Sequence, residues 1–255
     1  MKLEVLLSVM NLKKEELNNM NIATDCIVIN QCKVNNYEKY KNFKIYSYNE
    51  VGISNSRNKA LEHAKGDIIL FCDDDVVYYK DYEKKIINEF KNNKDADAIM
   101  FYFDSPNRYQ KMNKKNKRLY LYNSLKYGTI NIAIKKEVIE KYNIRFNSLF
   151  GSKEHFNSGE DTLFIVDLLR NKIKIYSSIV ILGKVNNESS TWFKGFNEKY
   201  FFDKGAIFCA INKKLRHLLF LQYLIRHKEV LNDIGFIKAY KQMCLGSKEY
   251  IKVIR

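Results

Sequence analysis

The segment from Asp67 to Asp75 constrains the fold more than any other part of the sequence. It reads Asp-Ile-Ile-Leu-Phe-Cys-Asp-Asp-Asp, an unbroken apolar run that leads directly into three carboxylates. A continuous apolar run with β-branched residues and no alternation is typical of a strand buried on both faces of a parallel sheet. Acids at the carboxyl end of such a strand stand where open α/β sheets bind ligands, and a divalent cation commonly relieves their repulsion. A polar turn that ends the strand is the alternative interpretation.

Strands and helices alternate along most of the sequence. The apolar patterns predict strands over residues 3–10, 25–30, 43–47, 96–103, 130–134 and 173–177. They predict helices over residues 13–19, 54–65, 82–91, 136–142 and 162–170. The second helix is expected to have Ser54 or Asn55 as its N-cap and to stop at Gly66. Elements of these lengths in alternation predict an α/β fold with a mostly parallel sheet flanked by helices.

Two segments depart from this alternation. Residues 104–118 hold the only proline and a basic run that begins at Lys111, which predicts either a solvated loop or a mobile loop over a charged substrate. The chain is expected to divide into a sheet domain at 1–200 and a helical region at 201–255. Within that region, residues 215–228 mix basic side chains with leucines. This composition suits either the interface of an anionic membrane or packing onto the sheet domain.

Charge and composition limit the classes of protein to which the chain can belong. Of its 255 residues, 46% are hydrophobic, enough for a full core, and the formal net charge is +15. This excess attracts nucleic acid, anionic lipid or a phosphorylated substrate, but no recognisable nucleic-acid-binding module accompanies it. The five cysteines form no C-x-x-C pair. Because the sequence shows no signal peptide and no apolar run of ~20 residues, a cytoplasmic location is expected.

Three sequence blocks matter in combination. The first, residues 52–58, feeds the helix before the acidic strand; the second, residues 71–75, ends that strand; the third, residues 158–161, reads Ser-Gly-Glu-Asp before a helix. In this order and spacing they resemble the family 2 glycosyltransferases, over roughly residues 1–184. That family has a Gly-x-x-x-x-Arg-Asn segment, a strand ending in Asp-x-Asp and a later Glu-Asp that opens a helix. The resemblance implies a GT-A fold, which is Rossmann-like.

The resemblance also implies a donor site for a nucleotide-diphosphate sugar, with UDP as the default nucleotide. A Mn²⁺ or Mg²⁺ ion would neutralise charge on the departing diphosphate. Asp75 is the expected direct ligand of the metal ion, and Asp73 is expected to face the metal ion or the ribose. Asp74 belongs to the same donor site, although a continuing strand would point its side chain the other way. Three more residues are expected beside the nucleotide: Gly52, Arg57 and Asn58. A purely structural salt bridge is the alternative interpretation of Arg57.

The catalytic groups follow from the same resemblance. Asp161 is expected to be the general base that takes the proton from the acceptor hydroxyl. Glu160 is expected to support that base or to bind the acceptor. A capping role for these acids at the start of the following helix is compatible with catalysis. Displacement in a single step would invert the anomeric carbon.

The chain departs from the family pattern at three positions. The Asp-x-Asp has become three consecutive acids, which leaves the choice of metal ligand open by one position. Where the family commonly has Asp-Asp-Gly-Ser after the second strand, this chain has Ile-Asn-Gln-Cys, so the amides of Asn30 and Gln31 are expected to bind the base. The usual downstream histidine is missing from residues 185–192. In that segment Trp192 is expected either to stack on a sugar or to be an ordinary buried aromatic residue.

The expected function is an inverting, metal-dependent transfer of a hexosyl or N-acetylhexosaminyl group to a glycan hydroxyl. The expected acceptor is a lipid-linked glycan at the inner face of the membrane, as in the assembly of a bacterial surface polysaccharide. A Gln-x-x-Arg-Trp signature of processive relatives is missing. Two alternatives are a nucleotidyltransferase, which would need a Gly-rich N-terminal loop, and a non-catalytic sugar- or nucleotide-binding protein on a decayed transferase fold.

Overall fold

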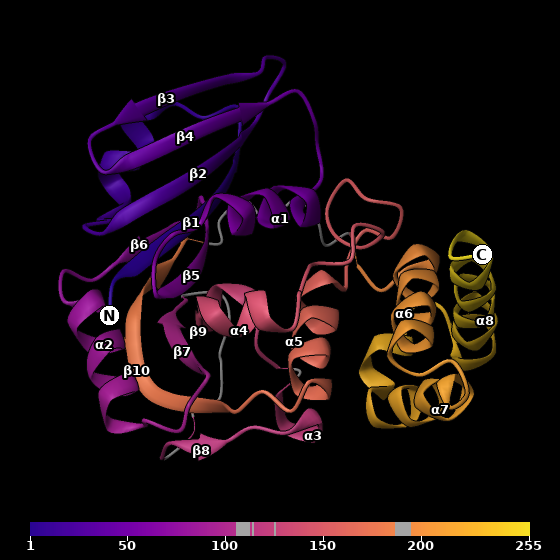
Figure 1. Ribbon diagram of the computed structural model, residues 1–255. Coiled ribbons are helices and arrows are strands. Elements are labelled where there is room, and N and C mark those ends of the chain that lie inside the picture. Colours follow the sequence, from indigo (N-terminus) through magenta and orange to yellow (C-terminus); the bar gives the residue numbers. More distant parts are fainter. Residues whose placement is uncertain (106–112, 114, 125, 187–194) are drawn as a thin grey trace.

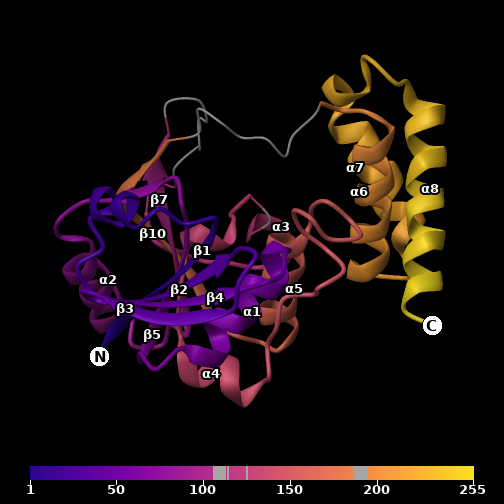
Figure 2. The ribbon, with the colours of Figure 1, turned by 90° about the horizontal axis from the view of Figure 1, so that it is seen from above.

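The computed structural model describes residues 1–105, 113, 115–124, 126–186 and 195–255. A sheet with helices on both faces makes up most of the molecule, and three helices from the C-terminal end of the chain stand at one side (Figure 1). Seen from above, these three helices form a group of their own beside the sheet (Figure 2). The predicted α/β class, with flanking helices and a helical C-terminal extension, is confirmed.

One half of the sheet is parallel. It contains β4 (Phe43–Tyr48), β2 (Asp25–Gln31), β1 (Leu3–Met10) and β5 (Ile68–Asp73), in that spatial order. Ser8 pairs with Asp73, and Met10 pairs with Gln31. The carboxyl ends of these strands therefore share one edge of the sheet, where α/β proteins place their ligands. The apolar run before the three acids forms β5, as predicted.

The other half of the sheet is mixed. Strand β9 (Ile132–Lys135) runs antiparallel between β5 and β7 (Ala98–Asp104), and β10 (Ile175–Val185) is parallel to β7. The sequence did not indicate three strands, each paired antiparallel with a neighbour: β3 (Asn36–Tyr40) on β4, and β6 (Val76–Tyr78) and β8 (Lys117–Arg118) on β10. The sheet is therefore less uniformly parallel than expected.

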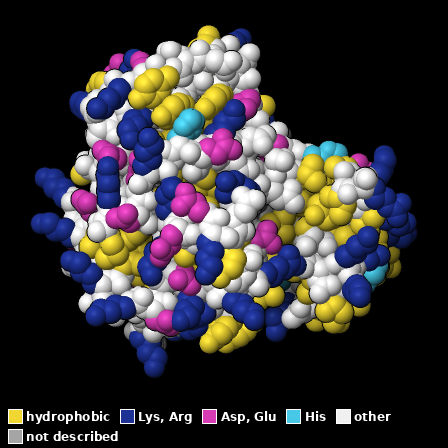
Figure 3. Space-filling view, in the orientation of Figure 1, with side chains coloured by type: hydrophobic (Ala, Val, Ile, Leu, Met, Phe, Trp, Pro, Cys, Tyr) yellow, Lys and Arg dark blue, Asp and Glu magenta, His cyan; other side chains and the backbone are white. Residues whose placement is uncertain are grey.

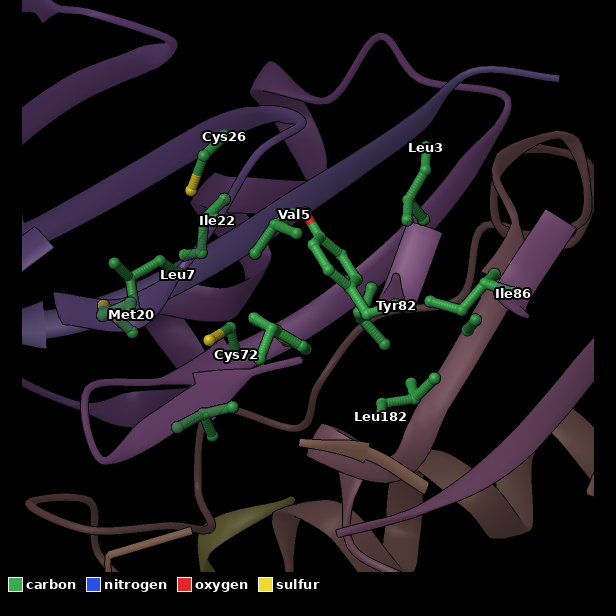
Figure 4. Close-up of a cluster of buried hydrophobic side chains, with 14 of the residues drawn as sticks. Leu3, Val5, Leu7, Met20, Ile22, Cys26, Cys72, Tyr82, Ile86 and Leu182 are labelled. Atoms are coloured by element: carbon green, nitrogen blue, oxygen red, sulfur yellow. The ribbon is translucent and has the colours of Figure 1, made fainter. Parts of the chain in front are cut away.

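Two layers of apolar side chains hold helices against the sheet. Helices α1 (Ile53–His63), α4 (Lys136–Lys141) and α5 (Glu160–Arg170) cover one face. The other face is covered by α2 (Tyr82–Asn92) and a 3₁₀ helix, η1 (Lys14–Met20). Figure 4 shows part of that second layer, where Tyr82 and Ile86 of α2 lie against side chains of β1 such as Leu3 and Val5.

The C-terminal region consists of α6 (Glu198–Ile211), α7 (Arg216–Arg226), the 3₁₀ helix η4 (Lys228–Leu231) and α8 (Phe236–Val253). Ile207 and Ile211 of α6 share an apolar cluster with Leu163 and Val166 of α5, so this region packs onto the sheet domain through α6. The predicted domain boundary at residue 200 lies within the first turn of α6. In the described parts of the chain, no helix has both the length and the apolar character needed to cross a bilayer.

Several predicted boundaries are corrected by tertiary contacts. Helix α1 begins at Ile53, one residue before the predicted start at 54, with Gly52 in the N-cap position, and it ends at His63, two residues before the predicted end at 65. The predicted N-cap Ser54 is fully buried and donates a hydrogen bond to the Phe150 carbonyl at 2.6 Å instead. The predicted strand over 130–134 starts with a 3₁₀ turn, η2 (Thr129–Asn131). The segment predicted as the helix 13–19 forms the 3₁₀ helix η1.

Candidate active site

A single guanidinium connects the three blocks that the sequence singled out. Arg57 of α1 donates hydrogen bonds to Asp161 at 2.7 Å and to Asp73 at 3.0 Å, and it lies 3.6 Å from a carboxylate oxygen of Glu160. Only 3% of Arg57 is exposed. Residues 104 positions apart in the chain are thus held together by one side chain. The blocks that were predicted to act together do lie together.

Local backbone geometry explains how the two catalytic candidates reach this point. Gly159 has φ +113°, and a Cβ there would lie 2.5 Å from Ile207. This conformation starts α5 at Glu160, so Glu160 and Asp161 occupy its first turn, where the positive end of the helix dipole favours acids. Thr129 donates its hydroxyl to the same Asp161 oxygen at 2.6 Å. The carboxylate of Asp161 is therefore oriented from two sides.

Burial and neighbouring charge perturb the groups around Arg57. Burial alone would lower the pKa of Arg57, but the charges of Asp73, Asp161 and Glu160 raise it above its ordinary value. Burial, assisted by repulsion from Asp161, raises the pKa of Glu160 to about 7, although Arg57 opposes this shift. Perturbed acids in such a cluster are frequent at functional sites.

The acidic turn after β5 carries charge that the described part of the chain does not neutralise. The strand ends at Asp73, and Asp74 and Asp75 form the turn before β6. Burial, together with repulsion from Asp73 and Asp74, raises the pKa of Asp75 to about 6. The pKa of Asp74 is raised by burial and by Asp73. Since Arg57 pairs with Asp73, no described cation lies within ion-pair distance of the other two carboxylates.

These carboxylates are suitable ligands for a hard divalent cation. Mg²⁺ and Mn²⁺ prefer oxygen ligands and are often bound by one or two carboxylates together with substrate phosphates. The surroundings of Asp75 destabilise its negative charge, so a bound cation would stabilise this carboxylate most. Asp73 is close enough in the chain to be a second ligand of the same ion. Within the described residues, no three His, Cys, Asp or Glu side chains gather into a metal-binding cluster. The metal assignment therefore stays a prediction.

The two residues expected to bind the base differ in how their amides are used. The Asn30 oxygen accepts from the Leu12 backbone at 3.0 Å, and its NH₂ group donates to Ser47 at 3.1 Å. Gln31 is only 4% exposed, and its side-chain oxygen has no hydrogen-bond partner in the part of the chain that the structure describes. A buried acceptor without a partner is costly and is usually explained by a missing ligand or water. Gln31 therefore fits the predicted role better than Asn30.

Gly52, which precedes α1, and Asn58, which lies within it, both have structural roles. Gly52 has φ +124°, and a Cβ there would lie 2.0 Å from the carboxylate of Glu154. The Asn55 backbone bonds to that carboxylate, which lies at the amino end of α1. Asn58 bonds the backbone of Phe146 twice, through its NH₂ group at 2.9 Å and its oxygen at 2.8 Å. A positioning role accounts for both Asn58 bonds, and its contact with a nucleotide stays a prediction.

Sequence reasoning missed Thr129 and Glu154, which support this site. Neither falls in a block that the sequence singled out, and Glu154 lies in a loop without helical or strand periodicity. No sequence pattern indicates either residue, because each contacts a residue that is far away in the chain. Trp192 and three residues of the basic run 111–118 (Lys111, Met112 and Lys114) lie outside the described residues, so the predictions for them stay untested. The described end of that run, Lys117–Arg118, forms strand β8 rather than part of a loop.

Comparisons with known proteins agree with this fold. Residues 22–170, more than half of the chain, match the family described as glycosyl transferase family 2. Staphylococcus aureus TarS (residues 1–349) in complex with UDP-GlcNAc is similar in structure, with a TM-score of 0.69 and 18% identity over 100% of this chain and 82% of that chain. A Pyrobaculum calidifontis mannosyltransferase in complex with GDP-Man and Mn²⁺ has a TM-score of 0.54 and 12% identity, over 98% of this chain and 75% of that one. No curated protein sequence matched.

Proposed function

The chain belongs to glycosyl transferase family 2, and we propose that it moves a sugar from a nucleotide diphosphate to a glycan hydroxyl with inversion at the anomeric carbon. The observation that carries this proposal is Arg57, which joins the donor-side acid Asp73 to the candidate base Asp161 in one buried cluster. The transferred group would be a hexose or an N-acetylhexosamine. Structural neighbours were solved with UDP-GlcNAc and with GDP-Man, which supports a nucleotide sugar as donor.

The donor would bind at the carboxyl edge of the parallel strands. Asp75 and Asp73 would hold Mn²⁺ or Mg²⁺, which when bound neutralises charge on the departing diphosphate. The Nε of Arg57 is buried and has no hydrogen-bond partner among the described residues, and it would donate to a phosphate oxygen of the bound donor. Asp74, which lies between Asp73 and Asp75 in the turn, would stand at the rim of the donor site.

The base of the nucleotide would lie against Gln31. Uracil presents an N–H flanked by two carbonyl oxygens, and the Gln31 amide can accept from that N–H while it donates to a carbonyl. Thymine presents the same edge, so this contact does not separate UDP from dTDP; UDP is the proposed donor nucleotide because a structural neighbour was solved with UDP-GlcNAc. Replacing Gln31 with Leu removes the acceptor and should weaken UDP binding by roughly tenfold, the effect of one hydrogen bond to a buried group. The same change at Asn30 would instead break the contact with Leu12 and loosen the fold.

Asp161 would take the proton from the acceptor hydroxyl as that oxygen attacks the anomeric carbon. Thr129 and Arg57 hold the Asp161 carboxylate in a fixed orientation, so little reorganisation is needed. Glu160, close to Asp161, would line the acceptor side. Acceptor binding would thus take place at the start of α5.

The proposed acceptor is a lipid-linked glycan at the inner face of a membrane, in the biosynthesis of a surface polysaccharide. The basic charge of the chain supports work near an anionic surface. A non-catalytic sugar- or nucleotide-binding protein is the competing proposal. The clustering of Asp73, Arg57 and Asp161 disfavours it, because binding a nucleotide does not require a base candidate held at the same point.

The test is slow hydrolysis of UDP-GlcNAc, in which water replaces the unknown acceptor. Proton NMR would follow the first sugar released, in the presence of Mn²⁺ and before the anomers equilibrate. The expected product is the β anomer, formed from the α-linked donor, with a rate about 10²–10⁴-fold lower in Asp161→Asn. Release of the α anomer would contradict inversion. Donor binding without any turnover in the original protein, even with mixed glycan acceptors, would favour the non-catalytic alternative.

A further inference from the structure

Helix α7 has an apolar face that nothing in the described structure covers. Its buried side is formed by Phe220 and Leu224, which pack against α6 and α8. The opposite side presents four large apolar residues at spacings of three and four positions, the first at its N-cap: Leu215, Leu218, Leu221 and Ile225. Leu218 and Ile225 are 62% and 59% exposed. Residues at this spacing share one face of a helix, so these four form a continuous stripe.

A second group of exposed apolar residues lies next to this stripe. Tyr120, Leu121 and Tyr122, at the start of α3 (Leu121–Ser124), are all exposed, and the rings of the two tyrosines stack at 5.8 Å. Leu121 and Leu215 line the same shallow pocket. Both α3 and α7 lie along the lower edge of the molecule in Figure 1. We call these seven residues the α3–α7 surface.

The charged side chains of α7 and of its immediate flanks are basic, up to Glu229, which follows the helix and lies 3.2 Å from His227. Residues 212–228 include five lysines and arginines and no acid: Lys213, Lys214, Arg216, Arg226 and Lys228. Four of the five are exposed, and Arg216 is half-buried. Figure 3 shows blue basic and yellow apolar side chains side by side over the region of α6, α7 and α8. Long basic side chains beside an apolar stripe can reach the headgroups while the stripe enters the acyl layer.

We propose that the α3–α7 surface docks onto an anionic lipid bilayer. The helix would lie in the interface with Leu218 and Ile225 inserted, and the lysines and arginines would contact acidic headgroups. Tyr120 and Tyr122 suit the headgroup level, where amphipathic rings gather. A partner protein would have to supply both an apolar groove and an unbroken row of acids, whereas an anionic monolayer supplies both at any point. This inference assigns a membrane contact to the proposed enzyme. It depends on the residues of the α3–α7 surface and does not depend on the transfer reaction.

The test is flotation of the full chain with two kinds of vesicle, one of phosphatidylcholine alone and one containing a third phosphatidylglycerol. The expected result is binding to the anionic vesicles only, which high salt weakens because the headgroup attraction is screened. The double variant Leu218→Ser/Ile225→Ser should lose roughly tenfold or more in binding, since two apolar side chains no longer enter the membrane. Val34→Ser is the matched control, because Val34 is 61% exposed in a turn far along the chain from α7.

Two further measurements separate this proposal from others. Stabilisation by UDP with Mn²⁺ should be equal in the double variant and in the original protein, which shows that the donor site and the fold are intact. If the protein does not bind UDP but still binds the anionic vesicles, the proposed transferase function fails. The α3–α7 surface then remains assigned to membrane binding. Equal vesicle binding by the double variant would overturn the proposal. So would a dimer in light scattering that the double variant abolishes, because the surface would then join two copies.

Discussion

Arg57 illustrates how one residue determines the arrangement of the site. Its guanidinium is buried and bonds Asp73 from β5 and Asp161 from α5 at the same time, while no described residue bonds its Nε. The sequence predicted Arg57, Asp73 and Asp161 as separate members of a site, because each lies in a recognisable block. It did not predict that Asn30 is satisfied within the sheet or that Glu154 lies at the start of α1. Those contacts join residues without periodic or motif patterns.

Replacing Arg57 with Met should destabilise the protein by about 3 kcal/mol, the low end for a buried charge that loses its partner. The low end applies because the Asp73 and Asp161 side chains are 36% and 33% exposed and keep some hydration. Urea denaturation measures the difference. Adding Asp161→Asn to the Met variant should restore part of the stability, since one unpaired carboxylate is removed. Unchanged stability in the single variant would show that the ion pairs are not formed in solution.

Gly52 should be intolerant of a side chain. Its φ of +124° is a conformation that L residues rarely adopt, and a Cβ would displace the Glu154 carboxylate from the start of α1. Gly52→Ala is therefore expected to lose about 2–3 kcal/mol in thermal or urea denaturation. Gly235→Ala is the control, because Gly235 has φ +72° but open space around it, so it reports backbone strain alone. Equal losses in the two variants would exclude the proposed clash.

At the scale of elements, the sequence predicts those that are buried by their own pattern and misses those held by their neighbours. Strand β5 is an unbroken apolar run and was recognised at once. Strand β3 is largely exposed and is held by pairing with β4, so it has no burial pattern to detect. The antiparallel direction of β9 was equally hidden, because apolar content indicates that a strand is buried but not which way it runs.

The contact between α6 and α8 depends on two glycines. A Cβ on Gly205 would lie 2.0 Å from the Met243 carbonyl oxygen, and one on Gly246 would lie 1.8 Å from that of Phe202. Gly205→Ala should therefore destabilise the protein by about 2–3 kcal/mol as the helices are forced apart. In an exposed helix the same change would stabilise by roughly 0.5–1 kcal/mol, because alanine is the better helix former. A rise in the melting temperature of Gly205→Ala would contradict this close packing.

At the scale of the whole molecule, three separate regions have three proposed roles. The carboxyl edge of the parallel strands would bind the donor, the start of α5 would bind the acceptor, and the α3–α7 surface would bind the membrane. Alternation of strands and helices was enough to predict the sheet with its flanking helices. It could not predict that α6 packs on α5 while α7 leaves an apolar face exposed, since both helices are rich in apolar residues. Which face of such a helix is covered depends on contacts between distant segments.

The measurement that tests the donor site most directly is stabilisation against unfolding by UDP, GDP, dTDP and CDP, each with Mn²⁺, with Mg²⁺ and with a chelator. A nucleotide that binds only the folded protein adds ~2.7 kcal/mol at a hundred times its dissociation constant. UDP is expected to stabilise the protein in the presence of either metal ion, and this effect should be lost with the chelator and in Asp75→Asn. If no nucleotide stabilises the protein with either metal, or if UDP does so equally in Asp75→Asn, the proposed metal-dependent donor site is wrong.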